Sequence, residues 1–292
     1  MTLDKTPAFP NEPAFWPAAL IPCYNHPKTV GLVAKTLRRY GLPVLIVNDG
    51  SNAETRAVLD CLAAEEKGVM VIHRPENGGK GAAVLTGFKA ALHRRFTHVL
   101  QVDADAQHDL NEIPTFLRVA KAEPDKLVCG YPVYDETVPK ARLFGRKLTN
   151  FWCAVNGLSL SFEDAMCGMR VYPMTAVEKV LDAHIGARMD FDPEILVRLL
   201  WLPVPVRNVP VRVTYPKGSV SHFDMVDDNV RISLMHARLC VGMIVRLPWI
   251  LGRRLRRLCR LCRRNAEACI PMAKDVSPTE NRQNRTDRGG RP

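Results

Sequence analysis

Pro43-Val-Leu-Ile-Val-Asn-Asp-Gly-Ser51 joins four consecutive aliphatic residues to a short polar turn. A run of this length and composition is typical of a strand that is buried on both faces of a parallel sheet. Apolar residues recur at helical spacing on either side of it, over residues 28–39 and 53–66. The stretch therefore predicts one strand of a sheet whose strands alternate with helices.

The same alternation continues along the first third of the chain. Short apolar runs predict strands at 18–22, 69–72 and 98–102, and a further helix is predicted at 82–94. This order indicates βαβ units. We therefore expect an α/β fold in which a Rossmann-like mixed, mostly parallel sheet is flanked by helices.

One large domain is expected over residues 18–226, after an irregular leader at residues 1–17. Its second half has a less regular pattern than its first half. There, the sequence predicts a helix from Met189 to Leu200 and a strand from Val204 to Tyr215.

The positive charge of the chain is concentrated at its end. The formal net charge is +11, and residues 253–292 hold twelve Lys and Arg against four Asp and Glu. The rest of the chain is nearly neutral, which argues against a nucleic-acid-binding surface on the main domain, and no nucleic acid partner is expected. The nine cysteines have no framework spacing, which indicates thiols in a reducing compartment.

No segment has the pattern of a signal peptide or of a membrane span. Residues 1–17 lack an apolar core region. The best candidate for a span, Leu239 to Gly252, is shorter than about 18 residues and is interrupted by Arg246 and Pro248. We therefore expect a cytoplasmic protein without a span.

The predicted strands end in polar segments, and the ends of parallel strands bind ligands at one edge of a sheet. Two carboxylates in Asp103-Ala-Asp105 are spaced to share one hard cation, as Mg²⁺ prefers. Asp49, after another strand, can accept hydrogen bonds from a nucleobase or ribose. In the loop 76–81, glycine N–H groups and Lys80 can approach an anion at a helix N-terminus.

Six motifs in this order resemble the family 2 glycosyltransferases of the GT-A fold, and within them the dolichol-phosphate mannosyltransferase-like branch. Asp164 to Arg170 is similar to the D-x-x-S-G-F-R segment of that branch, with Cys167 and Met169 as departures. The motifs span roughly residues 18–215 and are Ile21-Pro-Cys-Tyr-Asn25, Val47-Asn-Asp-Gly-Ser51, Asn77-Gly-Gly-Lys-Gly81, Val102-Asp-Ala-Asp-Ala-Gln-His108, Asp164-Ala-Met-Cys-Gly-Met-Arg170 and Phe191-Asp-Pro-Glu-Ile-Leu196.

The resemblance implies a metal-dependent transfer, with inversion, from a UDP- or GDP-sugar to a lipid-linked acceptor of the polyprenyl-phosphate type. It implies Asp103 and Asp105 as ligands of Mg²⁺ or Mn²⁺, with Gln107 as a further ligand, and it places Asp49 at the nucleoside. Asn25 and Lys80 are implied donor-site residues, with Asp103 beside them. Arg170 is expected near the diphosphate or the acceptor.

Several carboxylates are candidates for a catalytic base. A hydroxyl acceptor needs a base, whereas a lipid phosphate is already an anion and needs little help. The candidates are Asp164, Asp190, Asp192 and Glu194. Asp190 and Asp192 could instead be the N-cap and a first-turn charge of the helix that begins near Pro193.

Residues 227–264 predict an amphipathic helix, and seven arginines lie within residues 253–264. Such a segment with Trp249 suits peripheral contact with an anionic membrane, here at the inner face of the cytoplasmic membrane. The alternatives are packing on the domain with a solvated tail, and a nucleic-acid-binding tail. Residues 265–292 are expected to be a disordered basic tail.

Two other functions compete with glycosyl transfer. A nucleotidylyltransferase would need a glycine-rich basic loop directly after the first strand, where this chain has Pro22-Cys-Tyr-Asn25. A non-catalytic GT-A protein that binds nucleotide sugars at a membrane is the second. Intact Asp49, Asp103 and Asp105 argue against it.

Overall fold

A computed structural model describes residues 15–134, 140–214 and 226–268 of the chain. The chain divides into two compact units, Met1–Val245 and Arg246–Pro292. The first unit holds the sheet and continues into the first half of the last helix. The predicted leader and the predicted disordered tail lie almost wholly outside the described residues and stay predictions.

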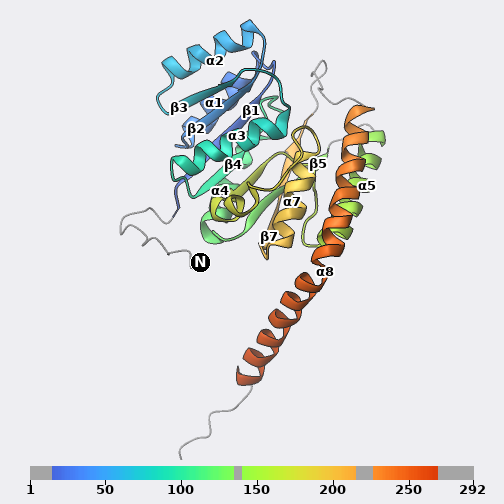
Figure 1. Ribbon diagram of the computed structural model, residues 1–292. Helices are drawn as coiled ribbons and strands as arrows, with labels where there is room; N and C mark the ends of the chain where they lie inside the picture. Colours follow the sequence, from blue (N-terminus) through green and yellow to red (C-terminus); the bar gives the residue numbers. More distant parts are fainter. Residues whose placement is uncertain (1–14, 135–139, 215–225, 269–292) are drawn as a thin grey trace, which may run out of the picture. The chain divides into compact units, whose positions relative to one another are not determined.

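The first half of the chain has the predicted alternation of strands and helices (Figure 1). Each predicted strand and helix of this half is present, with ends within about two residues of the expected ones. The elements are β1 (Pro17–Cys23), α1 (Val30–Arg39), β2 (Val44–Asp49), α2 (Ala53–Glu65), β3 (Val69–Arg74), α3 (Lys80–His93) and β4 (His98–Gln101).

The second half adds three strands and four α-helices before the last helix. The predicted helix near 189–200 is α7 and the predicted strand near 204–215 is β7. The elements are η1 (Leu110–Glu112), α4 (Ile113–Ala122), β5 (Leu127–Tyr134), α5 (Lys140–Gly157), β6 (Arg170–Pro173), α6 (Met174–Val177), η2 (Glu178–Val180), α7 (Phe191–Trp201) and β7 (Val206–Val213).

The strands form one seven-stranded sheet in the order β3-β2-β1-β4-β6-β5-β7. The pairs β1–β2, β1–β4, β2–β3 and β5–β7 are parallel, whereas β6 is antiparallel to both β4 and β5. The mixed, mostly parallel α/β architecture expected from the sequence is thereby confirmed.

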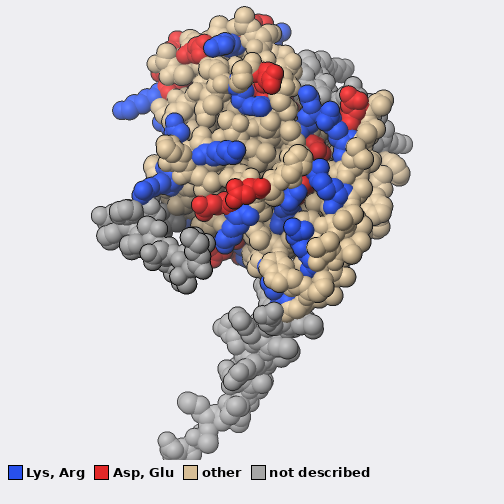
Figure 2. Space-filling view, in the orientation of Figure 1, with Lys and Arg blue, Asp and Glu red and all other residues tan. Residues whose placement is uncertain are grey.

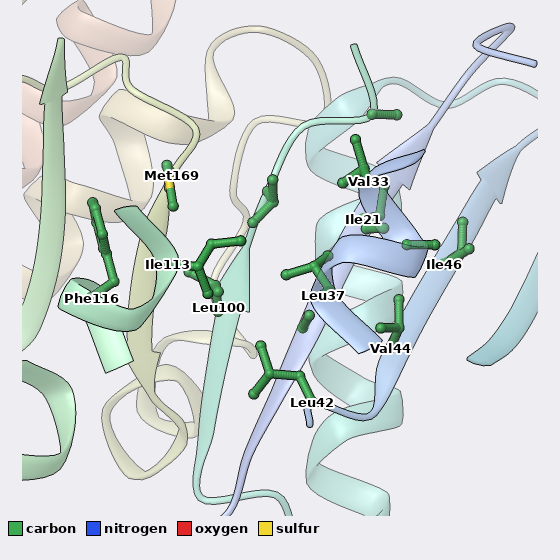
Figure 3. Close-up of a cluster of buried hydrophobic side chains, with 14 of the residues drawn as sticks. Ile21, Val33, Leu37, Leu42, Val44, Ile46, Leu100, Ile113, Phe116 and Met169 are labelled. Carbon is green, nitrogen blue, oxygen red and sulfur yellow. The ribbon is translucent and has the colours of Figure 1, made fainter. Parts of the chain in front are cut away.

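Alternate residues of the strands face two different layers of helices. On one face, Ile21 and Leu100 pack with Leu37 of α1 and Phe116 of α4 in a buried apolar cluster (Figure 3). The other face is covered by α3 and α7, where the Phe88 ring lies 5.0 Å from that of Tyr172. Gln101 of β4 is on this second face, where its Nε2 donates to Asp192 in the first turn of α7.

The last helix, α8 (Asp227–Ala268), is four residues longer than the predicted amphipathic segment. Its part from Asp227 to Arg253 is 27 residues long and contains an 18-residue window with a mean hydropathy of 1.4, of which 22% is buried. Within that window the apolar residues outweigh the charged ones. By length and composition this part could cross a membrane, so the expectation that the chain has no span stays a prediction. Length and composition alone do not establish a span.

Candidate functional site

Asn25 and Asp49 lie at the carboxyl ends of neighbouring strands, as predicted. Asn25 has a positive φ of 55°, and its Oδ1 accepts a hydrogen bond from the backbone N–H of Asn52 at 2.9 Å. Its own backbone N–H donates to Ser51 Oγ at 3.1 Å. Asn25 therefore ties the loop after β1 to the loop after β2. Its contact with a donor stays a prediction.

Asp49 organises the glycine-rich loop that precedes α3. Its side chain is buried, with 2% of the residue exposed, and it accepts backbone N–H groups of Gly78 at 3.1 Å and Gly79 at 2.7 Å. Arg74 Nη1 also donates to this carboxylate. The glycine N–H groups that we expected to bind an external anion thus bind the carboxylate of Asp49 in this structure.

Lys80, the first residue of α3, connects two carboxylates from different parts of the chain. Its Nζ lies 2.7 Å from Oδ1 of Asp103 and 2.9 Å from Oδ2 of Asp192. The second oxygen of Asp192 accepts a hydrogen bond from Gln101 Nε2 at 3.1 Å. Asp103 follows β4 and Asp192 lies in the first turn of α7. The sequence-predicted donor, metal and base candidates therefore meet here.

Electrostatics keep Lys80 and Asp103 ionised although both are largely buried. Burial alone would lower the pKa of Lys80, but Asp103 and Asp192 outweigh it and hold that pKa above its ordinary value. Burial would raise the pKa of Asp103, yet Lys80 and His108 hold it below the usual range. The side chain of Asp103 is still 22% exposed, so one carboxylate of the group reaches solvent.

Asp105 and Gln107 form a tight turn after Asp103. Oδ1 of Asp105 accepts the backbone N–H of Gln107 at 3.0 Å, and the carbonyl of Gln107 accepts the backbone N–H of Thr214 at 3.0 Å. This turn orients the carboxylate of Asp105. Whether the Gln107 side chain binds a metal stays a prediction.

The residues present fit a hard divalent cation. Within the described part of the chain, no three His, Cys, Asp or Glu side chains are grouped to hold a metal by themselves. Two carboxylates that leave other positions to water and phosphate oxygens are what Mg²⁺ accepts. Gly168 makes room for one of them, because a Cβ there would overlap the carboxylate of Asp103.

His108 is a site neighbour to which the sequence analysis gave no role. Its Nε2 lies 3.6 Å from Sγ of Cys167, the residue that departs from the family motif. Burial favours the neutral imidazole, but Cys167, Asp103 and Asp105 raise the pKa of His108 to about 9. The only sequence signal for His108 was its place in the Val102–His108 motif.

Asp164 shapes the loop that faces Asp103. Its carboxylate forms a two-point ion pair with Arg146 of α5 and accepts the backbone N–H groups of Met166 at 2.9 Å and Cys167 at 2.6 Å. Burial would raise the pKa of Asp164, but the bonds from Arg146 lower it. A lowered pKa makes a weaker base, so this geometry favours an organising role over a catalytic one.

Arg170 is fully buried, and this differs from the place at the diphosphate or acceptor that the resemblance implies. Nη1 donates to the carbonyl of Asp192 at 2.8 Å and Nη2 donates to the carbonyl of Ala165 at 2.6 Å. The Ala165 carbonyl lies in the irregular segment before β6, and the Asp192 carbonyl lies in the first turn of α7. In this structure Arg170 therefore positions the backbone at Asp192 and does not line the open site.

The two remaining carboxylates of α7 have different surroundings. Asp190 occupies the N-cap position without a side-chain cap bond, and its Oδ1 accepts the backbone N–H of Arg188 at 3.0 Å. Glu194 is fully buried and paired with Arg198 and Arg238. These pairs favour a structural role for Glu194, which leaves Asp192 as the base candidate nearest Asp103.

Known structures identify the fold. Glucosyl-3-phosphoglycerate synthase from Mycobacterium tuberculosis has a TM-score of 0.57 at 14% identity, over 78% of this chain and 80% of that one. The 1–349 fragment of S. aureus TarS, in complex with UDP-GlcNAc, has a TM-score of 0.53 at 12% identity, over 77% and 66%. The fold is thus that of GT-A glycosyltransferases.

Sequence comparison then gives the family. Residues 18–177 match the model of glycosyl transferase family 2, and the chain belongs to this family. Polyprenol monophosphomannose synthase of Mycolicibacterium smegmatis is 30% identical over 220 residues, which are 73% of this chain and 82% of that one. Undecaprenyl-phosphate mannosyltransferase of Micrococcus luteus is 28% identical over 203 residues, or 66% and 81%. The chain is a glycosyltransferase of the dolichol-phosphate-like branch.

Proposed function

We propose that the protein transfers a sugar from a UDP- or GDP-sugar to a polyprenyl-phosphate-type acceptor, with inversion and with the help of Mg²⁺ or Mn²⁺. The observation that supports this proposal best is the group formed by Lys80, Asp103 and Asp192. It collects an ammonium and two carboxylates at the carboxyl edge of a parallel sheet. Ligands of such sheets bind at this edge.

The residues that would bind the donor lie around this group. Asp103, Asp105 and Gln107 would hold the cation, which supplies positive charge to the leaving diphosphate when it is bound. Lys80 adds a fixed positive charge in a partly desolvated position, where its attraction to a diphosphate is stronger than in water. Asp49 and Asn25, at the ends of β2 and β1, would face the nucleoside.

The acceptor side is supported by α5. Its exposed face carries Phe144, Leu148, Phe151 and Trp152, which are 71%, 50%, 58% and 40% exposed. Clustered exposed aromatic and aliphatic side chains mark contact with a lipid or a partner. The names of the relatives are those of enzymes for polyprenol, dolichyl and undecaprenyl phosphates. A polyprenyl chain along α5 would bring its phosphate toward the site.

A phosphate acceptor also suits the chemistry of the side chains. The acceptor oxygen is already an anion, so it needs orientation more than it needs proton removal. Asp192, paired with Lys80, is placed to orient an acceptor or to hold the sugar. Attack from the face opposite the diphosphate inverts the sugar carbon, whose charge resembles an oxocarbenium ion in the transition state.

We also propose peripheral membrane contact at the inner face of the cytoplasmic membrane, through α5 and residues 227–264. The face of the main domain drawn in Figure 2 has no broad basic surface, because basic and acidic side chains are interspersed over it. A broad basic surface for nucleic acid would instead show one sign of charge.

A transfer assay tests the proposal. The purified chain is given radiolabelled UDP- or GDP-sugar with Mn²⁺ and either undecaprenyl phosphate or undecaprenol. We expect a lipid-linked product from the phosphate and none from the alcohol. Transfer to the alcohol, or to water alone with every donor, would contradict the proposed acceptor class.

A further inference from the structure

Glu194 is a fully buried carboxylate with four hydrogen bonds, and one of them comes from the last helix. Arg198, one turn further along α7, donates to Oε1 through Nε at 2.9 Å and through Nη2 at 2.6 Å. Arg238 of α8 donates to Oε2 through Nη2 at 2.5 Å. The backbone N–H of Gly186 donates to the same Oε2 at 2.8 Å.

The two carboxylate oxygens of Glu194 therefore have different hydrogen-bond partners. Oε1 is held within α7 itself, by Arg198. Oε2 is shared between a side chain of α8 and the backbone of the loop before α7. Arg238 is thus the contact that joins α8 to this carboxylate. It lies in the first unit, where His236 of α8 also contacts Asn156 Nδ2 at 3.2 Å.

The loop that contains Gly186 contacts the backbone on either side of Lys80. The carbonyl of Ala187 accepts the backbone N–H of Ala82 at 2.9 Å, in the first turn of α3. A Cβ on Gly81 would lie 2.5 Å from the carbonyl oxygen of Gly186. The loop 186–188 is therefore pressed against the residues on either side of Lys80, with no space between the two backbones.

Asp192 lies on the same short segment. It is two residues before Glu194 on α7, and its Oδ2 is 2.9 Å from Lys80 Nζ. A shift of Glu194 would therefore move both partners of this ion pair, one through the start of α7 and one through the loop 186–188. Buried ion pairs have few alternative arrangements, because an unpaired carboxylate is costly inside a protein.

We propose that Arg238 is a positioning residue. By holding Oε2 of Glu194, it fixes the loop 186–188 and so the position of Lys80 between Asp103 and Asp192. The contact of α8 with α7 at Glu194 thereby determines the geometry of the donor site. The inference rests on the proposed function only in taking the Lys80 group as the place of the reaction.

The test compares Arg238→Gln with Arg231→Gln in the full chain. Arg231 is exposed on the same helix, so its variant controls for the loss of a positive charge from α8. Hydrogen exchange of the backbone amides at 79–82 and 186–188 is measured together with KM for the donor and kcat. We expect faster exchange in both segments and about a tenfold loss of kcat for Arg238→Gln, because small misplacements of reacting groups are costly. Arg231→Gln should match the wild type.

Arg238→Lys extends the test, because it keeps a cationic donor on a different side chain. We expect amide exchange between that of the wild type and that of Arg238→Gln. Wild-type exchange at 79–82 and 186–188 in Arg238→Gln would overturn the proposal, as would a loss of thermal stability with unchanged kcat and KM. The exchange measurement needs no donor, so it decides this inference even if no transfer activity is found.

Discussion

Lys80 and Asp192 form an ion pair between the first turns of two helices, with Nζ 2.9 Å from Oδ2. The same Nζ lies 2.7 Å from Asp103, which leaves the group of two carboxylates and one ammonium with one negative charge in excess. Asp105 adds a second negative charge nearby, and His108, whose pKa is raised to about 9, offsets part of this charge. A site of this charge attracts a divalent cation and, once the cation is bound, accepts a diphosphate.

Replacing Lys80 by Met leaves Asp103 and Asp192 without their shared cation. Because two nearby carboxylates resist being ionised together, the pKa of one of them should rise. We expect a roughly 100-fold loss of kcat, since a fixed charge at the reacting group is removed. Lys89→Met is the control, because Lys89 is exposed on the same helix. Equal kcat values for the two variants would refute the role of Lys80.

Gly168→Ala should displace the Asp103 carboxylate, because the added Cβ would overlap it. We expect roughly a 100-fold loss of transfer and a loss of roughly 1–3 kcal/mol in stability, since the displaced carboxylate moves away from its ion pair with Lys80. Gly145→Ala in α5 is the matched control. No atom lies within 4 Å of its added Cβ, so this variant should gain about 0.5–1 kcal/mol. Full activity of Gly168→Ala would contradict the placement of Asp103.

Arg146→Met should make stability less dependent on pH. The pKa of Asp164 is lowered in the folded state, so its contribution is present above the unfolded pKa and is lost as pH falls through the folded pKa. Breaking this buried pair should cost about 3 kcal/mol at pH 7 in urea unfolding, and the difference from wild type should shrink in acid. Lys147→Met, at an exposed neighbouring position, is the control. A difference that is constant from pH 7 down to pH 3 would exclude this ion pair as its source.

Phe144→Glu with Phe151→Glu places two charges on the exposed apolar face of α5. We expect weaker sedimentation with anionic vesicles and a KM for undecaprenyl phosphate that is raised at least tenfold, since each aromatic buried in lipid contributes about 2 kcal/mol and about 1.4 kcal/mol is a factor of ten. Donor affinity should not change. A chain that lacks residues 253–292 isolates the contribution of the basic tail to vesicle binding. Unchanged sedimentation of both variants would rule out membrane contact through these segments.

Much of the fold was predictable because buried parallel strands have continuous apolar sequences. Val44 to Val47 is such a run, and β2 is buried along its whole length. The motif Asp103-Ala-Asp105 could be placed at a strand end for the same reason. Local sequence is sufficient where a strand is long, apolar and followed by a polar turn.

The strand β6 was not predictable in this way. It has four residues and begins with Arg170, a charged residue that ordinarily indicates a surface position. Its burial depends on two carbonyls, that of Ala165 in an irregular segment and that of Asp192 in the first turn of α7. Only the three-dimensional structure brings these acceptors to the guanidinium.

Contacts between residues that are distant in the sequence could not be predicted either. Glu194 has the residue type and motif position of a catalytic base, yet Arg198 and Arg238 bind both its oxygens. Arg238 is on α8, in a segment that the sequence assigned to membrane contact. Residue type and motif position identified the residues near the site, whereas packing between α7 and α8 decides which of them can reach a substrate.

The most direct test of the central claim is donor binding with and without metal. UDP-, GDP-, CMP- and dTDP-sugars are added with Mn²⁺ or with EDTA, and thermal unfolding of the wild type is compared with that of Asp105→Asn. For one nucleotide we predict a stabilisation of about 2.7 kcal/mol at 100 times its dissociation constant, dependent on Mn²⁺ and lost in Asp105→Asn. Equal stabilisation in EDTA, or in Asp105→Asn with Mn²⁺, would contradict a metal-bridged donor held by Asp103 and Asp105.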